Sequence, residues 1–242
     1  MCGLVGVAGT IDVKAKDAFW NLLIFSQVRG MTSTGVAAVE RYKNTVSILK
    51  DVGVPTDLCQ YKQFDSIFSN GGKIAYIGHN RAKTVGEATK KNAHPFRHGD
   101  IVGAHNGTLF SSAKNKLEGL SNRFDTDSEG IFYNLDVNGV DDTIEKLDGA
   151  WALTWFNTEN DQLYMTRNNQ RELYYCYSED RKLLFWASEH WFLKAALLRN
   201  GFKSEDPYVV KEGHIHGWKI PAYGEPFQAP EISPYKEKPE KS

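Results

Sequence analysis

The sequence has few cysteines and no excess of charge of either sign. Its 242 residues carry a formal net charge of −1 at pH 7, which gives no electrostatic reason to expect a nucleic acid or a membrane surface as partner. No apolar run reaches the ~18 residues of a membrane-spanning helix, and no basic segment followed by an apolar stretch opens the chain. We therefore expect a cytoplasmic protein.

Patterns that bind metals or cofactors are also missing. The three cysteines are widely separated and lack the paired spacing of metal ligands, which favours a reducing compartment: Cys2, Cys59 and Cys176. His214 and His216 share one face of an expected strand and could bind a metal, but no third ligand lies nearby, so an exposed strand is the favoured interpretation. No glycine-rich phosphate loop is present. We expect neither a metal nor a cofactor.

The most informative feature is Cys2, which follows Met1 and opens a glycine-spaced apolar run over 2–9. Removal of Met1 would leave a thiol and a free α-amine on one residue. Because the amine titrates near ~8 and the thiol near ~8.5, the amine can take the thiol proton at neutral pH, directly or through a water. The alternative is an ordinary cysteine at the start of a buried strand.

Periodicity and turn residues predict strands and helices along the chain. Helices are expected to end near Gly30, to begin at the capping box Thr126-Asp127-Ser128-Glu129, and to run from about Glu189 to Arg199. Strands are expected at 2–9, 35–40, 46–49, 73–78, 101–105, 150–156, 162–166, 173–177, 183–187 and 214–219, with a hairpin around Asn44 and a four-strand meander over 150–187. Two groups of antiparallel strands with helices outside them predict an α+β sandwich of stacked sheets.

The chain is long enough for one domain, which we expect over 1–225. From Pro226 onward, prolines alternate with lysine and glutamate, a composition that cannot build a core. Residues 226–242 are therefore expected to form a flexible C-terminal tail.

Three polar positions allow both a functional and a structural interpretation. Arg81 follows an expected strand, where it could bind a carboxylate bidentately or simply lie on the surface. Asn106-Gly107 is a strong hairpin-turn signal, but the carboxamide and the glycine N–H could also bind a developing oxyanion. Asp127 could complement a helix dipole or accept a substrate ammonium.

Taken in order, six blocks resemble the class II glutamine amidotransferase domain, the glutaminase module of N-terminal-nucleophile hydrolases such as the amino-sugar synthases. They are Cys2-Gly3 with Gly6, Arg29-Gly30, Gly78-His79-Asn80-Arg81 with Thr84 and Gly86, Asn92-Ala93-His94-Pro95, His105-Asn106-Gly107 and Thr126-Asp127-Ser128-Glu129. The resemblance covers roughly 2–219. It implies a four-layer αββα sandwich, consistent with the stacked sheets.

The resemblance also implies a role for each matched residue. Cys2 would attack the side-chain amide of L-glutamine, form a γ-glutamyl thioester and release ammonia. Asn106 and Gly107 match the oxyanion hole, Arg81 the partner of the substrate α-carboxylate, and Asp127 the partner of its α-ammonium. The remaining matches are two residues of the substrate loops, Thr84 and His94, and four supporting residues, Arg29, Gly30, His79 and Gly86.

The sequence departs from the family pattern at three places. Met31-Thr32 stands where an acid usually follows the matched arginine and glycine, Ala82 replaces an aromatic residue, and Val85 replaces the histidine of the amino-sugar enzymes. These changes predict a looser glutamine loop and argue against the amino-sugar subgroup. The nucleophile, oxyanion and substrate positions are intact.

Only the short tail follows the matched region. The sequence therefore predicts a stand-alone glutaminase that supplies glutamate and ammonia, with a separate synthase as the partner that accepts the ammonia. One alternative is an N-terminal-nucleophile amidase that acts on another γ-glutamyl compound or small amide. A non-catalytic regulatory module that keeps the fold is the other.

Overall fold

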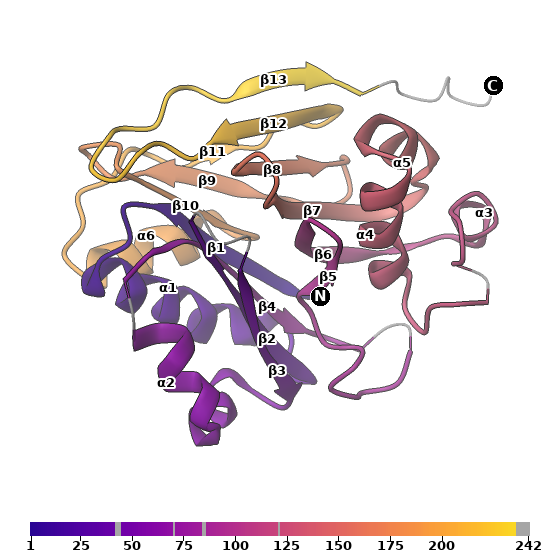
Figure 1. Ribbon diagram of the computed structural model, residues 1–242, viewed down its shortest axis with the longest axis horizontal. Helices are drawn as coiled ribbons and strands as arrows, with labels where there is room; N and C mark the ends of the chain where they lie inside the picture. Colours follow the sequence, from indigo (N-terminus) through magenta and orange to yellow (C-terminus); the bar gives the residue numbers. More distant parts are fainter. Residues whose placement is uncertain (42–44, 70, 84–85, 121, 236–242) are drawn as a thin grey trace.

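Two antiparallel sheets pack face to face, and helices cover both outer faces (Figure 1). This computed structural model describes residues 1–41, 45–69, 71–83, 86–120 and 122–235. Every strand pair in the described residues is antiparallel. The expected fold class, a four-layer αββα sandwich, is confirmed.

The seven-stranded sheet has the order β11-β9-β10-β1-β4-β2-β3. Its strands are β1 (Gly3–Gly9), β2 (Ser33–Glu40), β3 (Val46–Val52), β4 (Lys73–Arg81), β9 (Tyr174–Tyr177), β10 (Leu183–Ala187) and β11 (Tyr208–Val209). The elements on its outer side are α1 (Val13–Ser26), the 3₁₀ helices Gln27–Arg29 and Pro55–Gln60, α2 (Lys62–Ser69) and α6 (His190–Arg199).

The six-stranded sheet has the order β13-β12-β8-β7-β6-β5. Its strands are β5 (Phe96–His98), β6 (Ile101–Leu109), β7 (Gly149–Asn157), β8 (Gln162–Arg167), β12 (His214–Lys219) and β13 (Glu231–Pro234). The helices on this side are α3 (Ser111–Lys114), α4 (Asp127–Val137) and α5 (Val140–Lys146). The capping box is confirmed, since the Thr126 hydroxyl accepts from the Glu129 N–H at 3.3 Å.

Three apolar clusters separate the four layers, and β1 contributes to two of them. Leu4 packs between the sheets, whereas Val5 and Val7 pack against the helices, because successive side chains of a strand point to opposite faces. Gly6 leaves room for a neighbour, since a Cβ there would lie 1.9 Å from the Trp186 ring. A strand buried on both faces reads as a continuous apolar run, which explains the pattern over 2–9.

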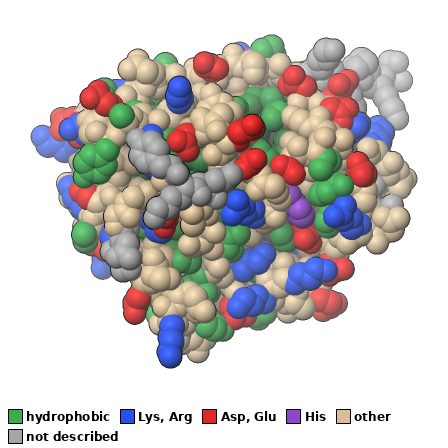
Figure 2. Space-filling model, viewed as in Figure 1, with side chains coloured by type: hydrophobic (Ala, Val, Ile, Leu, Met, Phe, Trp, Pro, Cys, Tyr) green, Lys and Arg blue, Asp and Glu red, His purple; other side chains and the backbone are tan. Residues whose placement is uncertain are grey.

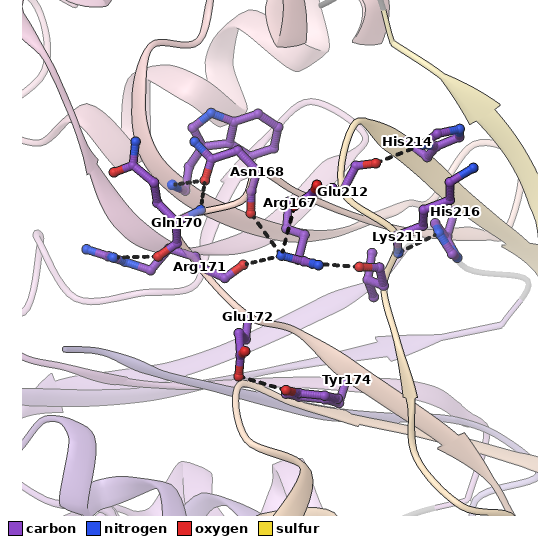
Figure 3. Close-up of polar contacts among 12 residues, drawn as sticks. Arg167, Asn168, Gln170, Arg171, Glu172, Tyr174, Lys211, Glu212, His214 and His216 are labelled. Atoms are coloured by element: carbon purple, nitrogen blue, oxygen red, sulfur yellow. Dashed lines mark hydrogen bonds and ion pairs between the residues drawn. The ribbon is translucent and has the colours of Figure 1, made fainter.

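The strands between 150 and 187 form two hairpins in different sheets, not the expected meander. β7 pairs with β8 in the six-stranded sheet, and β9 pairs with β10 in the seven-stranded sheet. Arg167 stabilises the segment in which the chain passes from β8 to β9. Its guanidinium donates to the carbonyls of Val210 at 2.6 Å and Asn168 at 3.1 Å (Figure 3). Turn residues mark where a chain reverses, but they do not specify which sheet the next strand joins.

Two strands run further than the sequence predicted. β6 continues through Asn106 and Gly107, which lie opposite Ala152 and Trp151, so the hairpin-turn interpretation is wrong. A Cβ on Gly107 would lie 1.9 Å from the Ala150 carbonyl oxygen, so this glycine permits close approach of β7. β4 likewise extends through Arg81, where a loop was expected.

The region predicted as a flexible tail is partly ordered. Phe227 is buried in the core between the sheets, and β13 pairs with β12, with Ser233 opposite Ile215. Backbone hydrogen bonds to an edge strand need no apolar pattern, and the β13 side chains are exposed, which is why composition alone did not reveal this strand. Residues 236–242, and the Asn44 turn of the confirmed β2–β3 hairpin, lie outside the described residues.

The surface matches the balanced composition. Figure 2 shows basic and acidic side chains intermixed on one face of the molecule. Across the described part of the chain, no helix has both the length and the apolar character needed to span a membrane.

Candidate active site

Cys2 immediately precedes the central strand β1 and is only 7% exposed. Its Sγ accepts a hydrogen bond from the Ala82 N–H at 3.4 Å. Burial raises the pKa of the Cys2 thiol, and the hydrogen bond from Ala82 acts in the opposite direction without cancelling that effect. The thiol is therefore neutral at pH 7 and needs a base before it can act as a nucleophile.

Arg29 holds the backbone of Cys2. Its Nε donates to the Cys2 carbonyl at 2.7 Å, and its NH1 forms an ion pair with Glu189, the residue that precedes α6. Glu189 lies 160 residues away in sequence and was missed by sequence reasoning, because no local signal marks so distant a partner. Glu189 therefore provides Arg29 with an acidic partner, although this chain has Met31-Thr32 where an acid usually follows the matched arginine and glycine.

Arg81 ends β4 and is only 4% exposed, so it is not a surface arginine. Burial lowers the pKa of its guanidinium, while Cys2 and Asp127 act in the opposite direction. The next residue, Ala82, donates its N–H to Cys2 Sγ, so the end of β4 lies beside the nucleophile. Its NH1 donates to the Glu87 carbonyl at 3.1 Å, and the Asn92 carboxamide donates to the same oxygen at 3.1 Å. The chain after β4 therefore folds back over this arginine.

Asn106 reaches across from the six-stranded sheet toward β1. Its Nδ2 donates to the Ser188 hydroxyl at 3.3 Å, and that hydroxyl accepts from the Leu4 N–H at 3.0 Å. Ser188 was also missed by sequence reasoning. Ser188 thus connects the Asn106 side chain to β1, the strand that directly follows Cys2.

Asp127 occupies the first turn of α4 and is 6% exposed. Its Oδ2 accepts from the Leu109 N–H at 2.8 Å, and its Oδ1 accepts from the Ser128 N–H at 2.9 Å. No lysine or arginine pairs with it among the salt bridges of the described residues. Its position as a first-turn acid is borne out, and its carboxylate oxygens retain acceptor capacity for a further donor.

Three buried histidines lie together behind these residues. The rings of His79 and His94 stack with centroids 4.0 Å apart, and His94 Nδ1 accepts from the His105 N–H at 3.2 Å. Burial lowers the pKa of all three imidazoles, that of His79 to about 3, so all are neutral at pH 7. His94 thus packs inside the structure, and its substrate contact stays a prediction.

The two supporting glycines permit close backbone approaches. A Cβ on Gly30 would lie 2.4 Å from the Ala82 nitrogen, next to the sulfur of Cys2. Gly86 has a φ of +74°, which glycine adopts without strain, and a Cβ there would lie 2.7 Å from the Asp125 carbonyl oxygen. Thr84 and Val85 lie outside the described residues.

A cleft of about 590 Å³ opens on the segment that covers Arg81, but Cys2, Arg81, Asn106 and Asp127 do not line it. It is lined by Gly86, Glu87, Thr89, Lys91, Asn92 and Asp125. Lys91 and Asp125 form an ion pair at its rim, with Nζ 2.9 Å from Oδ2.

No group of three or more histidine, cysteine or acidic side chains within the described ranges could hold a metal. His214 contacts the Glu212 carbonyl at 2.8 Å through its Nδ1, and His216 Nε2 accepts from the Lys211 N–H at 3.1 Å (Figure 3). Burial lowers the pKa of His216 to about 4. Both histidines are thus bound to nearby backbone.

Comparison with known proteins agrees with this arrangement. A family model described as a glutamine amidotransferase domain matches residues 79–195. The isomerizing glutamine–fructose-6-phosphate aminotransferase of Bacillus spizizenii is 30% identical over 187 residues, which cover 72% of this chain and 30% of that protein. The chain carries a class II glutamine amidotransferase domain. The isomerizing glutamine–fructose-6-phosphate aminotransferase of Methanococcus maripaludis is 28% identical over 195 residues, which cover 72% of this chain and 31% of that protein.

Solved structures agree with this domain at the level of the fold. The glutamine phosphoribosylpyrophosphate amidotransferase from B. subtilis, complexed with ADP and GMP, aligns with a TM-score of 0.74 at 19% identity, covering 98% of this chain and 50% of that one. A class-II glutamine aminotransferase domain protein from Silicibacter pomeroyi aligns with a TM-score of 0.57 at 14% identity, covering 98% of this chain and all of that one. The amidotransferase domain therefore has the N-terminal-nucleophile hydrolase fold. The chain spans about 30% of the length of the curated relatives it matches.

Proposed function

We propose that this amidotransferase domain hydrolyses the side-chain amide of L-glutamine and passes the ammonia to a synthase partner. The observation that carries the proposal is the meeting of three buried groups. Cys2 Sγ accepts a hydrogen bond from Ala82, the residue after Arg81, and the segment that covers Arg81 lies against Asp125 and Thr126, which directly precede Asp127. A cation, an anion and a nucleophile in one site suit a free amino acid whose side chain reacts.

The reaction would proceed through a thioester. Cys2 Sγ attacks the amide carbon of glutamine while the thiol proton moves to the α-amine of the same residue, directly or through a water. The Asn106 carboxamide and the Gly107 N–H bind the oxyanion, and the α-ammonium returns the proton as ammonia leaves. Water then attacks the γ-glutamyl thioester, which releases glutamate and restores the thiol.

This mechanism requires removal of Met1, because an amide nitrogen at Cys2 has no basic lone pair. Met1 is 70% exposed, so a peptidase can reach it. A free amine is also what the buried thiol needs, since burial disfavours the thiolate. We expect intact-mass analysis of active protein to show a chain that begins at Cys2; retained methionine in fully active protein would contradict the mechanism.

Arg81 would bind the α-carboxylate of glutamine and Asp127 its α-ammonium, and Thr84 and His94 would contribute to substrate binding. Arg29 with Gly30, and His79 with Gly86, would support the nucleophile and the loop. The partner would accept ammonia directly, because protonation to ammonium in water removes its nucleophilic lone pair.

The deciding experiment measures glutamate and ammonia released from L-glutamine by the processed protein, with γ-glutamyl amides and other small amides as competing substrates. The proposal expects glutamine to have the highest kcat/KM. A preference for another γ-glutamyl amide would favour the alternative amidase, and no turnover of any amide would favour a regulatory module.

Partner dependence is measured as the glutaminase rate with and without co-purified proteins. Ordering of the glutamine loop by a partner should raise the rate, and a tenfold gain requires the partner to favour the closed state by about 1.4 kcal/mol. Full activity with no partner recovered would contradict the proposed transfer of ammonia to another protein.

A further inference from the structure

The imidazole of His105 lies between two residues with different roles in the proposed site. His105 immediately precedes Asn106 and Gly107 on β6. Its Nδ1 lies 2.9 Å from the Ser128 hydroxyl on α4, and its Nε2 lies 2.6 Å from the position that a Cβ on Gly107 would take. One edge of the ring therefore faces α4, and the other faces the oxyanion glycine.

Ser128 extends this contact to Asp127. Its N–H donates to Asp127 Oδ1 at 2.9 Å, and its hydroxyl lies 3.4 Å from the same oxygen. The other carboxylate oxygen accepts from the Leu109 N–H, so Ser128 and the end of β6 together orient the carboxylate. The three side chains of Asp127, Ser128 and His105 are all buried, and water does not substitute for these contacts readily.

The backbone of His105 is held by two further histidines, one of them on the opposite sheet. Its carbonyl oxygen lies 3.1 Å from His79 Nε2 on β4, and its N–H donates to His94. Burial lowers the pKa of its imidazole, although the Asp127 carboxylate acts in the opposite direction, and the ring is neutral at pH 7. A neutral ring has one donor and one acceptor nitrogen. Nδ1 contacts the Ser128 hydroxyl, whereas Nε2 faces Gly107 and makes no hydrogen bond of normal geometry in the described structure.

We propose that His105 and Ser128 are positioning residues that set the Asp127 carboxylate relative to Gly107. This inference rests on the proposed function and deepens it. The α-ammonium and the amide carbonyl of glutamine are joined by a flexible chain. The carbonyl meets its oxyanion donors only if the ammonium is anchored at the right distance, and a displacement of about 1 Å can cost roughly 10²-fold in rate.

Paired variants of His105 test the two edges of the ring separately. The carboxamide of His105→Asn occupies the place of Nδ1 and can keep the bond to Ser128, whereas that of His105→Gln reaches the place of Nε2 and loses it. Ser128→Ala removes the link to Asp127 by deleting one oxygen, which keeps the test open if the His105 variants do not fold. Thr143→Val is the matched control, because it deletes a buried hydroxyl on α5 that has no hydrogen-bond partner.

The readouts are kcat and KM for glutamine, and the Kd for glutamine measured by calorimetry in a Cys2→Ala background. Ser128→Ala and His105→Gln should raise KM and Kd roughly three- to tenfold, as expected for loss of a hydrogen bond that orients a charged group. His105→Asn should keep KM near the wild-type value. It should lower kcat about tenfold, because the part of the ring that packs beside Gly107 is lost and this oxyanion donor is less well positioned. Thr143→Val should change neither constant.

Equal effects of His105→Asn and His105→Gln, or a Ser128→Ala variant with KM and Kd within twofold of wild type, would overturn the inference. The proposed function fails separately. A wild-type protein that binds glutamine without hydrolysing it overturns the glutaminase proposal, and the effect of Ser128→Ala on Kd still decides the positioning role. A wild-type protein that does not bind glutamine overturns both.

Discussion

The two sheets support their parts of the proposed site in different ways. On the six-stranded side, Asp127 is held by neighbours that are close in sequence, with Ser128 next to it and Leu109 18 residues away. On the seven-stranded side, Cys2 is held by Ala82, 80 residues away, and by Arg29, which pairs with a glutamate 160 residues further along. Local support can be recognised as a motif, whereas support from distant residues cannot.

The largest expected effect is on the nucleophile. Cys2→Ala should abolish glutamine hydrolysis and leave the fold intact, because no other thiol lies in the site. Cys59→Ala is the matched control, since this exposed cysteine is remote from the described contacts of Cys2, and it should keep full activity. The measurement is a steady-state assay with unfolding monitored in parallel. Normal turnover by Cys2→Ala would show that Cys2 is not the nucleophile, so the support it receives from distant residues would have no catalytic meaning.

The next effect is on the oxyanion side. Asn106→Ala should lower kcat by roughly 10²–10³ with a smaller change in KM, because one donor to the oxyanion is lost. Asn160→Ala, in the turn between β7 and β8, serves as a control and should match the wild type. A kcat for Asn106→Ala within threefold of wild type would mean that the six-stranded side does not supply this donor.

The substrate anchors should show the opposite pattern. Arg81→Lys and Asp127→Asn should raise KM about tenfold and change kcat less, since both contact parts of glutamine that do not react. Arg123→Lys, at an exposed arginine stacked on Tyr133, is the control for the arginine change. Initial-rate measurements over a wide range of glutamine concentration distinguish the patterns, and a loss confined to kcat would contradict these assignments.

The smallest expected effect comes from Glu189, the distant residue that pairs with Arg29 beside Cys2. Glu189→Gln should lower kcat roughly three- to tenfold, because a partly exposed ion pair contributes modestly and Arg29 keeps its bond to the Cys2 carbonyl. Glu205→Gln is the control, as it weakens a comparable ion pair with Arg181. If the two variants had equal kcat values, the distant acid would have no part in holding the nucleophile.

Much of the fold could be predicted, because strands and helices follow from local patterns. The buried run of β1, the capping box of α4 and the β2–β3 hairpin were all legible in sequence. The prediction of a turn at Asn106-Gly107 was wrong, because close packing against β7 can require glycine as strongly as a turn does. The crossing between β8 and β9 was missed because sheet membership depends on long-range pairing.

The sequence by itself determined the residue types of the site and their order along the chain. A cysteine after Met1, an arginine after a strand, an Asn-Gly pair and an acid in a capping box define chemistry whose pattern is local. Only the tertiary structure decided that Glu189 pairs with Arg29, that Ser188 joins Asn106 to β1, and that His105 lies between Ser128 and Gly107. These contacts join residues far apart in sequence, and they arise because two sheets pack face to face, which no local pattern encodes.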